Sequence, residues 1–148
     1  MRSIAGCLLR DIIGLRQFHL GIYLVAEIEM TRMNETFLGH RGCTDVITFD
    51  YTEPRGNRTR SPLARSTLPT SMLHGEIFIC MDEALRQSKI FKVSWQSELA
   101  RYLVHGILHL CGYEDGRAAD RKKMKAREDQ LLEQLGKQIS LRGLAARR

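Results

Sequence analysis

Paired cysteines are missing from this sequence of 148 residues. Its four cysteines stand at positions 7, 43, 80 and 111, and no two of them have CxxC spacing. Zinc ribbons need close cysteine pairs, and small secreted scaffolds need a dense set of disulfides. We therefore exclude both classes and expect a protein with reduced thiols in the cytoplasm.

Long apolar runs are missing as well. No stretch approaches the ~18 consecutive apolar residues of a membrane span, so we expect no membrane partner. Residues 4–7 are similar to a lipoprotein cleavage box, but only six residues precede the cysteine, and a signal peptide needs an apolar stretch of ~7–15 residues. The segment 3–15 instead repeats apolar residues at helical spacing and is predicted to be a helix.

No repeat or domain linker interrupts the chain, and its hydrophobic content of 43% is enough to bury a core without disulfides. We predict one domain over residues 1–138. Residues 52–74 are rich in Pro, Arg, Ser and Thr and show no periodicity, so we expect a long basic loop there. Residues 139–148 are expected to form a basic, flexible tail.

Hydrophobic periodicity divides the rest of the chain into short strands and longer helices. Segments rich in β-branched and aromatic residues predict strands at 20–25, 44–51 and 76–80. Apolar residues at helical spacing predict further helices at 27–38, 82–90, 94–110 and 117–135. These elements predict an α+β fold in which a small mixed β-sheet is covered by helices.

Two histidines in a predicted helix form the most informative motif of the chain. His105 and His109 are four residues apart, so they project from one face of the helix and can bind one ion. Gly112 is a residue type that ends helices, and Glu114 or Asp115 can follow as a third, oxygen ligand. Three ligands leave one coordination position open, as in catalytic zinc sites. The alternative is a pair of partly buried histidines that only hydrogen-bond to the backbone.

The residues around these histidines resemble the signature of the YbeY family of bacterial rRNA-maturation endoribonucleases, HGxLHLxGYDH. The matching positions are His105, Gly106, Leu108, His109, Leu110, Gly112 and Tyr113. Residues 33–40 and 44–49 resemble the family's LNxxYRG…TDVLSF block, and residues 75–80 resemble its GDIxI strand. Three blocks in the family's order are more specific than any single motif.

The resemblance implies the family fold, in which one divalent ion, zinc, lies in a cleft between sheet and motif helix, at the end of that helix. It implies that His105, His109 and Asp115 bind this ion, with Asp115 at the position of the family's third histidine. A carboxylate is a competent zinc ligand, and the His2Asp set also suits nickel, manganese or iron. Leu38 stands where the family has a catalytic arginine, and Arg41 is our candidate to supply that charge.

Glu76 and Glu114 are the candidate acid or base residues, and either could instead be a surface carboxylate. Glu76 aligns with the acid of the family's GD pair, and for Glu114 we favour a hydrogen-bonding role beside the metal. Gly106 occupies the position of the general base in HExxH proteases, which argues against peptide hydrolysis by that mechanism.

The chain carries 23 Lys and Arg against 17 Asp and Glu, a formal net charge of +6. Basic residues gather in the long loop, in residues 121–127 and in the tail, and such a field attracts a polyanion. For residues 121–127 a solvated helix face is an equal alternative, because acidic residues lie close by in the sequence. No RRM, KH or zinc-finger pattern is present, so sequence-specific reading of RNA is not supported, and no DNA partner is expected.

A divalent ion with an open position can polarise a phosphodiester and promote its hydrolysis near neutral pH. We therefore predict a metal-dependent endoribonuclease specific for single strands. The resemblance implies that it matures the 3′ end of small-subunit rRNA, with single-stranded RNA and the small ribosomal subunit as partners. Two alternatives stay open: a metallohydrolase of peptide or small substrates, and a noncatalytic ribosome-associated RNA-binding module with a structural metal.

Overall fold

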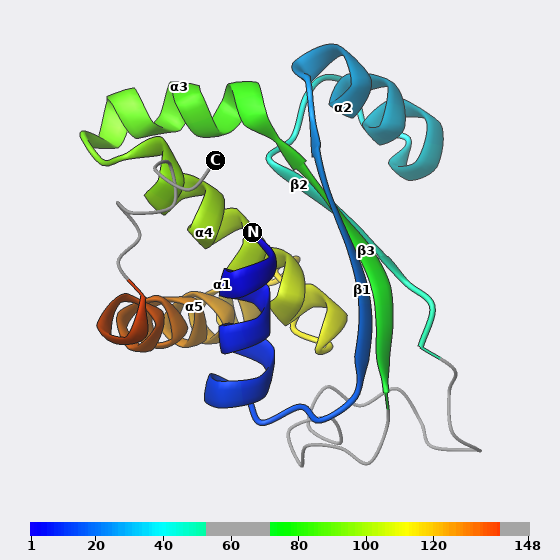
Figure 1. The fold of residues 1–148 in the computed structure, drawn as a ribbon. Coiled ribbons are helices and arrows are strands. Elements are labelled where there is room, and N and C mark those ends of the chain that lie inside the picture. The colour runs from blue at the N-terminus through cyan, green and yellow to red at the C-terminus, as the bar shows by residue number, and fades with distance from the viewer. Residues whose placement is uncertain (53–71, 140–148) are drawn as a thin grey trace.

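A computed structural model describes residues 1–52 and 72–139 of the chain (Figure 1). Most of the predicted basic loop at 52–74 and nearly all of the predicted tail at 139–148 lie outside the described residues. The extent of the single domain and the character of these two segments therefore stay predictions.

The described chain alternates helices and short strands in the predicted order (Figure 1). The elements are α1 (Arg2–Gly6) continued by the π-helical η1 (Cys7–Ile12), β1 (Phe18–Val25), α2 (Glu27–Met33) continued by the π-helical η2 (Asn34–Leu38), β2 (Val46–Asp50), β3 (Leu73–Cys80), α3 (Met81–Phe91), α4 (Trp95–Leu110) and α5 (Ala118–Gln138). Within these residues the α+β fold is confirmed.

Several predicted boundaries were off by one to three residues, and two of these differences have a clear physical cause. The first helix ends at Ile12 rather than at residue 15, because Gly14 takes a positive φ of 81° that an α-helix does not continue through. The third strand begins at Leu73, inside the predicted loop, because β1 pairs with it from Phe18 onward. Pairing between distant segments thus extended a strand that the local pattern had ended early.

The sheet is mixed, as predicted, and β3 is its central strand. Strand order is β1-β3-β2, with β1 parallel and β2 antiparallel to β3. Ile77 and Ile79 of β3 are fully buried and lie on one face of the strand, because alternate residues of a strand point the same way. That face is covered by α4, which contacts both β2 and β3.

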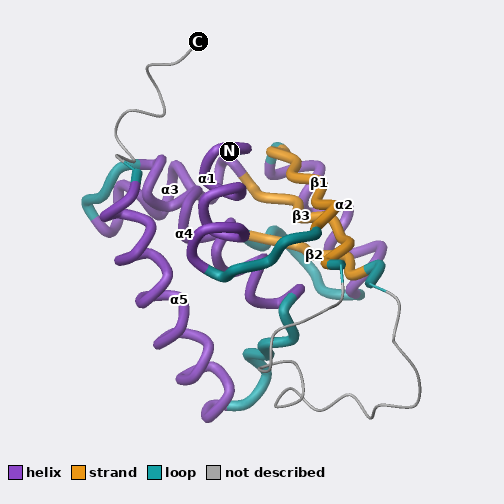
Figure 2. Tube along the Cα trace, turned by 60° about the horizontal axis from the view of Figure 1, so that its bottom comes forward, coloured by secondary structure: helices purple, strands orange, loops and turns teal. Residues whose placement is uncertain are grey.

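Helix α4 lies at the centre of the main hydrophobic core. It packs on the sheet on one side and against α5 on the other, and η1 packs against α5 in turn (Figures 1 and 2). Leu103 and Ile107 of α4 are fully buried, and burial of such a side chain contributes about 1.5–3 kcal/mol. The helix that carries the histidine motif is therefore held on both sides.

Two glycines bring α4 unusually close to the sheet. A Cβ atom on Gly106 would lie 2.8 Å from Cγ2 of Ile77 on β3, and one on Gly75 would lie 2.9 Å from Cδ2 of Leu110 on α4. Both distances are shorter than side chains tolerate, so each position needs glycine for packing. This explains why the position of the HExxH glutamate is glycine in this chain.

A smaller core lies on the other face of the sheet, beneath α2. It is formed by Val25, Met30, Ile47 and Cys80. Burial and the neighbouring Cys80 thiol raise the pKa of Cys43 to about 12, which keeps that thiol protonated. No disulfide joins cysteines within the described residues.

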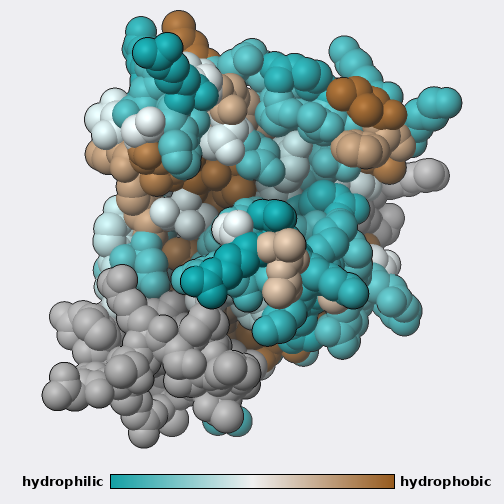
Figure 3. Space-filling view, turned by 180° about the vertical axis from the view of Figure 1, so that it is seen from behind, coloured by the Kyte–Doolittle hydropathy of each residue, from teal (hydrophilic) through white to brown (hydrophobic). Residues whose placement is uncertain are grey.

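The molecular surface seen from behind is mostly hydrophilic, with apolar residues in separate patches (Figure 3). Among the exposed apolar side chains are Ile90 and Phe91 at the end of α3, at 62% and 64% exposure. None of the helices in the described ranges has the length and apolar character needed to cross a membrane.

Candidate metal centre

The histidine motif lies on the last turns of α4, and both ends of this helix are defined by local hydrogen bonds. At the start, the Ser94 side chain accepts from the backbone N–H of Ser97 at 3.1 Å. At the end, the N–H of Gly112 donates to the carbonyl of His109, and the N–H of Tyr113 donates to that of Leu108. These two bonds form a Schellman motif, for which Gly112 supplies the positive φ of 93°.

Three side chains meet just beyond this helix end. His105 Nε2 and His109 Nε2 are 3.1 Å apart, and Asp115 Oδ2 lies 3.8 Å from the first and 3.7 Å from the second. At zinc–ligand bonds of about 2.0–2.2 Å, tetrahedral ligands lie about 3.3–3.5 Å apart. The three atoms thus need shifts of only a few tenths of an ångström to enclose one ion.

Glu128, on α5, orients the first histidine. Its Oε2 atom accepts a hydrogen bond from His105 Nδ1 at 2.9 Å. The glutamate is buried, and its other oxygen accepts from Arg101 at 2.8 Å and Lys125 at 3.1 Å. Burial alone would raise the pKa of Glu128, but these three donors lower it to about 2. The carboxylate is therefore ionised and holds the His105 ring through Nδ1, the nitrogen that faces away from His109 and Asp115.

A backbone carbonyl orients the second histidine. His109 Nδ1 lies 3.1 Å from the carbonyl oxygen of Tyr113, the residue that closes the Schellman motif. The turn that ends α4 therefore also fixes the ring next to it. A carboxylate on one ligating histidine and a carbonyl on the other are the usual supports of metal-binding imidazoles.

These supports decide which ring nitrogen is available for a metal. Each Nδ1 faces an acceptor and so carries the proton, which leaves a lone pair on each Nε2. Two such lone pairs 3.1 Å apart repel each other unless a cation lies between them. The donor set of His105, His109 and Asp115 therefore fits a divalent cation.

A proton can take the place of that cation. Burial lowers the pKa of His105, but the hydrogen bond and charge of Glu128 outweigh this and raise it above its ordinary value. Burial and the charge of His105 lower the pKa of His109. Without an ion, His105 is thus the histidine that is protonated first, and a metal must displace its proton.

The third candidate ligand, Asp115, comes from the turn after α4 rather than from a helix. Arg121 donates to the carbonyls of Asp115 and Gly116 at 3.0 Å each, which ties this turn to α5. The Asp115 side chain is 51% exposed, so the site is open to solvent on that side. The only group of potential metal ligands among the described residues contains Asp115 and not Glu114, which is exposed.

The structure does not bring Glu76 to this group. Glu76 lies on β3 between Gly75 and Ile77, and these two neighbours face α4. Its own side chain therefore points to the opposite face of the sheet, where it accepts hydrogen bonds from Tyr23 at 3.1 Å and Tyr51 at 2.9 Å. These two bonds raise the pKa values of both tyrosines.

Arg41 lies in the exposed segment between η2 and β2, and Leu38 ends η2 with 47% exposure. The arginine that belongs to the network around the histidines is instead Arg101, one turn before His105 on α4. Sequence reasoning did not identify Arg101, although its i, i+4 spacing from His105 is a usable signal.

Sequence reasoning also missed Glu128, although the spacing of apolar residues in α5 could have indicated that it is buried. The buried residues of α5 are Met124, Glu128, Leu131 and Leu135. Their spacing is that of one helix face, and a glutamate in an apolar stripe needs a buried partner. That partner is His105, 23 residues earlier in the chain.

A known protein family matches most of this chain. The family described as "Endoribonuclease YbeY" matches residues 6–136. The chain belongs to the YbeY family. The family's match covers all three metal-binding candidates and Glu128, and it ends within α5.

Individual relatives carry the same description. An "Endoribonuclease YbeY" of Salinibacter ruber is 34% identical over 122 residues, which cover 82% of this chain and 73% of the relative. Those of Chlorobium phaeovibrioides and Flavobacterium johnsoniae are 34% and 37% identical over 75% and 67% of this chain, and the chain spans 64% and 60% of their lengths. The chain is thus similar to the greater part of each relative but not to all of it.

Among solved structures, the chain resembles the solution structure of TM1509 from Thermotoga maritima. The TM-score is 0.58 at 24% sequence identity, over 90% of this chain and 77% of the other. This structural similarity supports the α+β fold described above.

Proposed function

We propose that this chain is a metal-dependent endoribonuclease that cuts single-stranded RNA. The observation that carries the proposal is the meeting of His105, His109 and Asp115 at the end of α4, in a member of the YbeY family. Zinc is our first choice of ion, because two imidazoles and a carboxylate with an open position form a set found in catalytic zinc sites.

The ion, the groups that orient the histidines and the exposure of the site each have a role in the proposed reaction. A divalent ion held there would act as a Lewis acid on a phosphodiester oxygen and acidify a water bound to it. Glu128 and the Tyr113 carbonyl keep the Nε2 atoms of His105 and His109 pointing to one place. The side chains of these histidines are 22% and 26% exposed, so an RNA strand can reach them.

Three further residues were candidates from the sequence, and none of them is given a main catalytic role in this proposal. Glu114 is exposed beside Asp115, and for it we propose a hydrogen-bonding role beside the metal. Glu76 is engaged with two tyrosines on the other face of the sheet, and we assign no step to it. Arg41 is retained only as a residue that attracts the RNA backbone.

We propose that the substrate is rRNA near the 3′ end of the small-subunit molecule and that cleavage takes place in the cytoplasm, on or near the small ribosomal subunit. Family membership supports the RNA class, and the positive net charge supports a polyanionic partner. The alternative of a peptide hydrolase lacks support, because Gly106 takes the position of its general base and packs against Ile77.

The test compares the wild-type chain with His109→Ala. Metal content is measured by elemental analysis, and cleavage is measured on one labelled rRNA fragment, as a single strand and as a duplex. We expect the wild type to hold one equivalent of ion and to cut only the single strand, and His109→Ala to lose both properties while its circular dichroism spectrum is unchanged.

The matched control is His19→Ala, because His19 is exposed on β1 and stacks on His74 instead of joining the metal candidates. It should keep both metal and cleavage. RNA binding without cleavage by metal-loaded wild type would instead favour a noncatalytic module. Cleavage of a peptide that is blocked by chelator and unaffected by RNA would favour a metallohydrolase of other substrates.

A further inference from the structure

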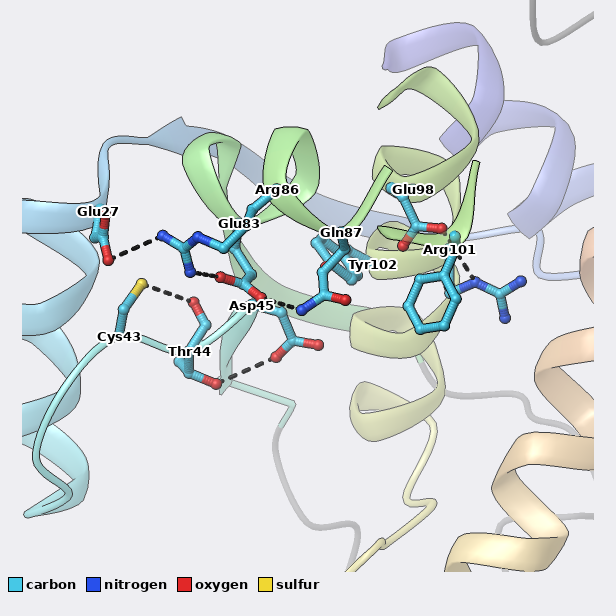
Figure 4. Close-up of a pocket in the computed structure, with 11 residues that line it drawn as sticks. Glu27, Cys43, Thr44, Asp45, Glu83, Arg86, Gln87, Glu98, Arg101 and Tyr102 are labelled. Atoms are coloured by element: carbon cyan, nitrogen blue, oxygen red, sulfur yellow. Dashed lines mark hydrogen bonds and ion pairs between the residues drawn. The ribbon is translucent and has the colours of Figure 1, made fainter. Parts of the chain in front are cut away.

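A second hollow adjoins the candidate metal centre. A cavity of about 650 Å³ lies among α2, α3, the first half of α4 and the segment before β2 (Figure 4). Arg101 lines this cavity and also donates to Glu128, the residue that orients His105. Asp45 lines it too, and the charge of Asp45 acts on both histidines. The cavity and the candidate metal centre are therefore joined through one hydrogen-bonded chain of Arg101, Glu128 and His105.

The charges of the cavity do not suit a phosphate group. Its arginines are already paired, since Arg86 contacts Glu27 at 3.1 Å and also binds Glu83, and Arg101 contacts Glu128 at 2.8 Å. The lining holds four carboxylates and two guanidinium groups: Glu27, Asp45, Glu83, Glu98, Arg86 and Arg101. A phosphate would therefore meet an excess of negative charge, whereas a neutral polar ring would not.

Hydrogen-bond acceptors in the cavity are left without donors among the described residues. The Glu98 side chain is 6% exposed, and its ion pair with Arg101 Nε is 3.9 Å long, which is too long for a hydrogen bond. Asp45 accepts from the Thr44 hydroxyl and the Val46 N–H, but both bonds go to Oδ1. Both carboxylates line the cavity, so a ligand that donates to their open oxygens gains charge-assisted hydrogen bonds.

Flat groups line the same space. Tyr102 and the Arg86 guanidinium line the cavity (Figure 4). Phe91 also lines it and is 64% exposed. Aromatic rings and guanidinium planes are the surfaces on which unstacked RNA bases are held. The cavity thus combines stacking surfaces with acceptors that lack donors.

We propose that this cavity binds one base of the RNA strand that is cut at the metal centre, and that it prefers guanine. The proposal rests on the proposed endoribonuclease function. Guanine presents N1–H and N2–H2 donors that match the Asp45 and Glu98 oxygens. Uracil offers a single N–H between two carbonyl oxygens, which would face carboxylates and be repelled. The expected order of affinity therefore begins with guanine and ends with uracil.

Free nucleosides test this directly, because they contain no phosphodiester bond to be cut. Guanosine, adenosine, cytidine and uridine are titrated into the metal-loaded, full-length protein, and binding is followed by NMR shifts of the Gln87 side-chain amide, which lines the cavity. We expect guanosine to bind most tightly and uridine least. In Glu98→Gln the affinity for guanosine should fall roughly tenfold or more, because a bond to a charged acceptor is lost.

The control variant is Glu133→Gln, which changes an exposed carboxylate paired with Lys137 on α5 and should leave every nucleoside affinity unchanged. Equal affinities of the wild type for all four nucleosides, or equal shifts with inorganic phosphate, would overturn the inference even if Glu98→Gln fails to fold. Cleavage of single-stranded RNA by the same preparation separates the two proposals. Cleavage without base preference rejects the base pocket alone, whereas guanosine binding without cleavage rejects the proposed function.

Discussion

His105 Nδ1 and Glu128 Oε2 are 2.9 Å apart, and this bond joins the motif helix to a helix that begins beyond the motif. The glutamate is also held by Arg101 and Lys125, so its position does not depend on the histidine alone. A carboxylate so placed fixes the tautomer of the ring and makes its free nitrogen a better ligand. The first prediction follows from this bond.

We expect Glu128→Gln to weaken metal binding by about 10–100-fold, the usual effect of removing such a support. The amide keeps the shape of the glutamate but loses the charge that favours the Nδ1 proton on His105. Affinity is measured by competition with a chromogenic chelator, so no activity is needed. Glu133→Gln, an exposed position on the same helix, should bind metal as the wild type does. An unchanged affinity in Glu128→Gln would remove Glu128 from the site.

The second prediction concerns the third ligand. Asp115→Ala should weaken metal binding, because the ion loses its anionic ligand, whereas Glu114→Ala should keep it, because the structure places only Asp115 with the histidines. Asp115→His should retain the ion and move the acidic limb of the pH–rate profile to lower pH, since a neutral ligand leaves more positive charge at the ion. Equilibrium dialysis and a cleavage pH profile check both parts. The reverse result for Asp115→Ala and Glu114→Ala would make Glu114 the ligand.

The third prediction concerns the close packing of α4 on the sheet. Gly106→Ala should destabilise the fold by about 1–3 kcal/mol, because its Cβ would lie 2.8 Å from Ile77 in a packed core, and this outweighs the gain of up to about 1 kcal/mol in helix propensity. Gly136→Ala is the matched control. It also lies in a helix, but nothing is within 4 Å of its added Cβ, so it should gain about 0.5–1 kcal/mol. Urea unfolding of the two variants should give opposite signs.

The fourth prediction concerns acid stability of the metal-free protein. The pKa of Glu128 is lowered on folding from 4.5 to about 2, so its ionised form stabilises the native state above pH 4.5. As the pH falls from about 4.5 to about 2, this stabilisation is lost, because the unfolded chain takes up the proton more readily. Urea midpoints of the wild type should therefore fall more steeply over this range than those of Glu128→Gln. Parallel curves for the two proteins would contradict the assigned pKa.

The parts of the site that the sequence predicted are those encoded locally. The i, i+4 spacing of His105 and His109 and the glycine that stops the helix act within a few residues, so their geometry followed from helix rules. The residues that support the site come from elsewhere in the chain. Glu128 meets His105 only because α5 packs on α4, and no local pattern fixes how two helices pack.

The same distinction holds for the fold. Element types and their order were predicted throughout the described ranges, because hydrophobic periodicity is a property of single segments. The position of β3 between β1 and β2 and its start at Leu73 depend on pairing across more than fifty residues. Glu76 is an example, because its place in the motif did not indicate on which face of the sheet its side chain would lie.

Two of the candidate ligands, His109 and Asp115, are held in place in different ways. His109 is part of a helix packed on both sides, whereas Asp115 is carried by an exposed turn that Arg121 fastens through backbone carbonyls. Because Arg121 binds main-chain atoms, the identity of the side chain at position 115 does not affect this fastening. A change of side chain at position 115 would therefore alter the candidate ligand and leave this support of the turn in place.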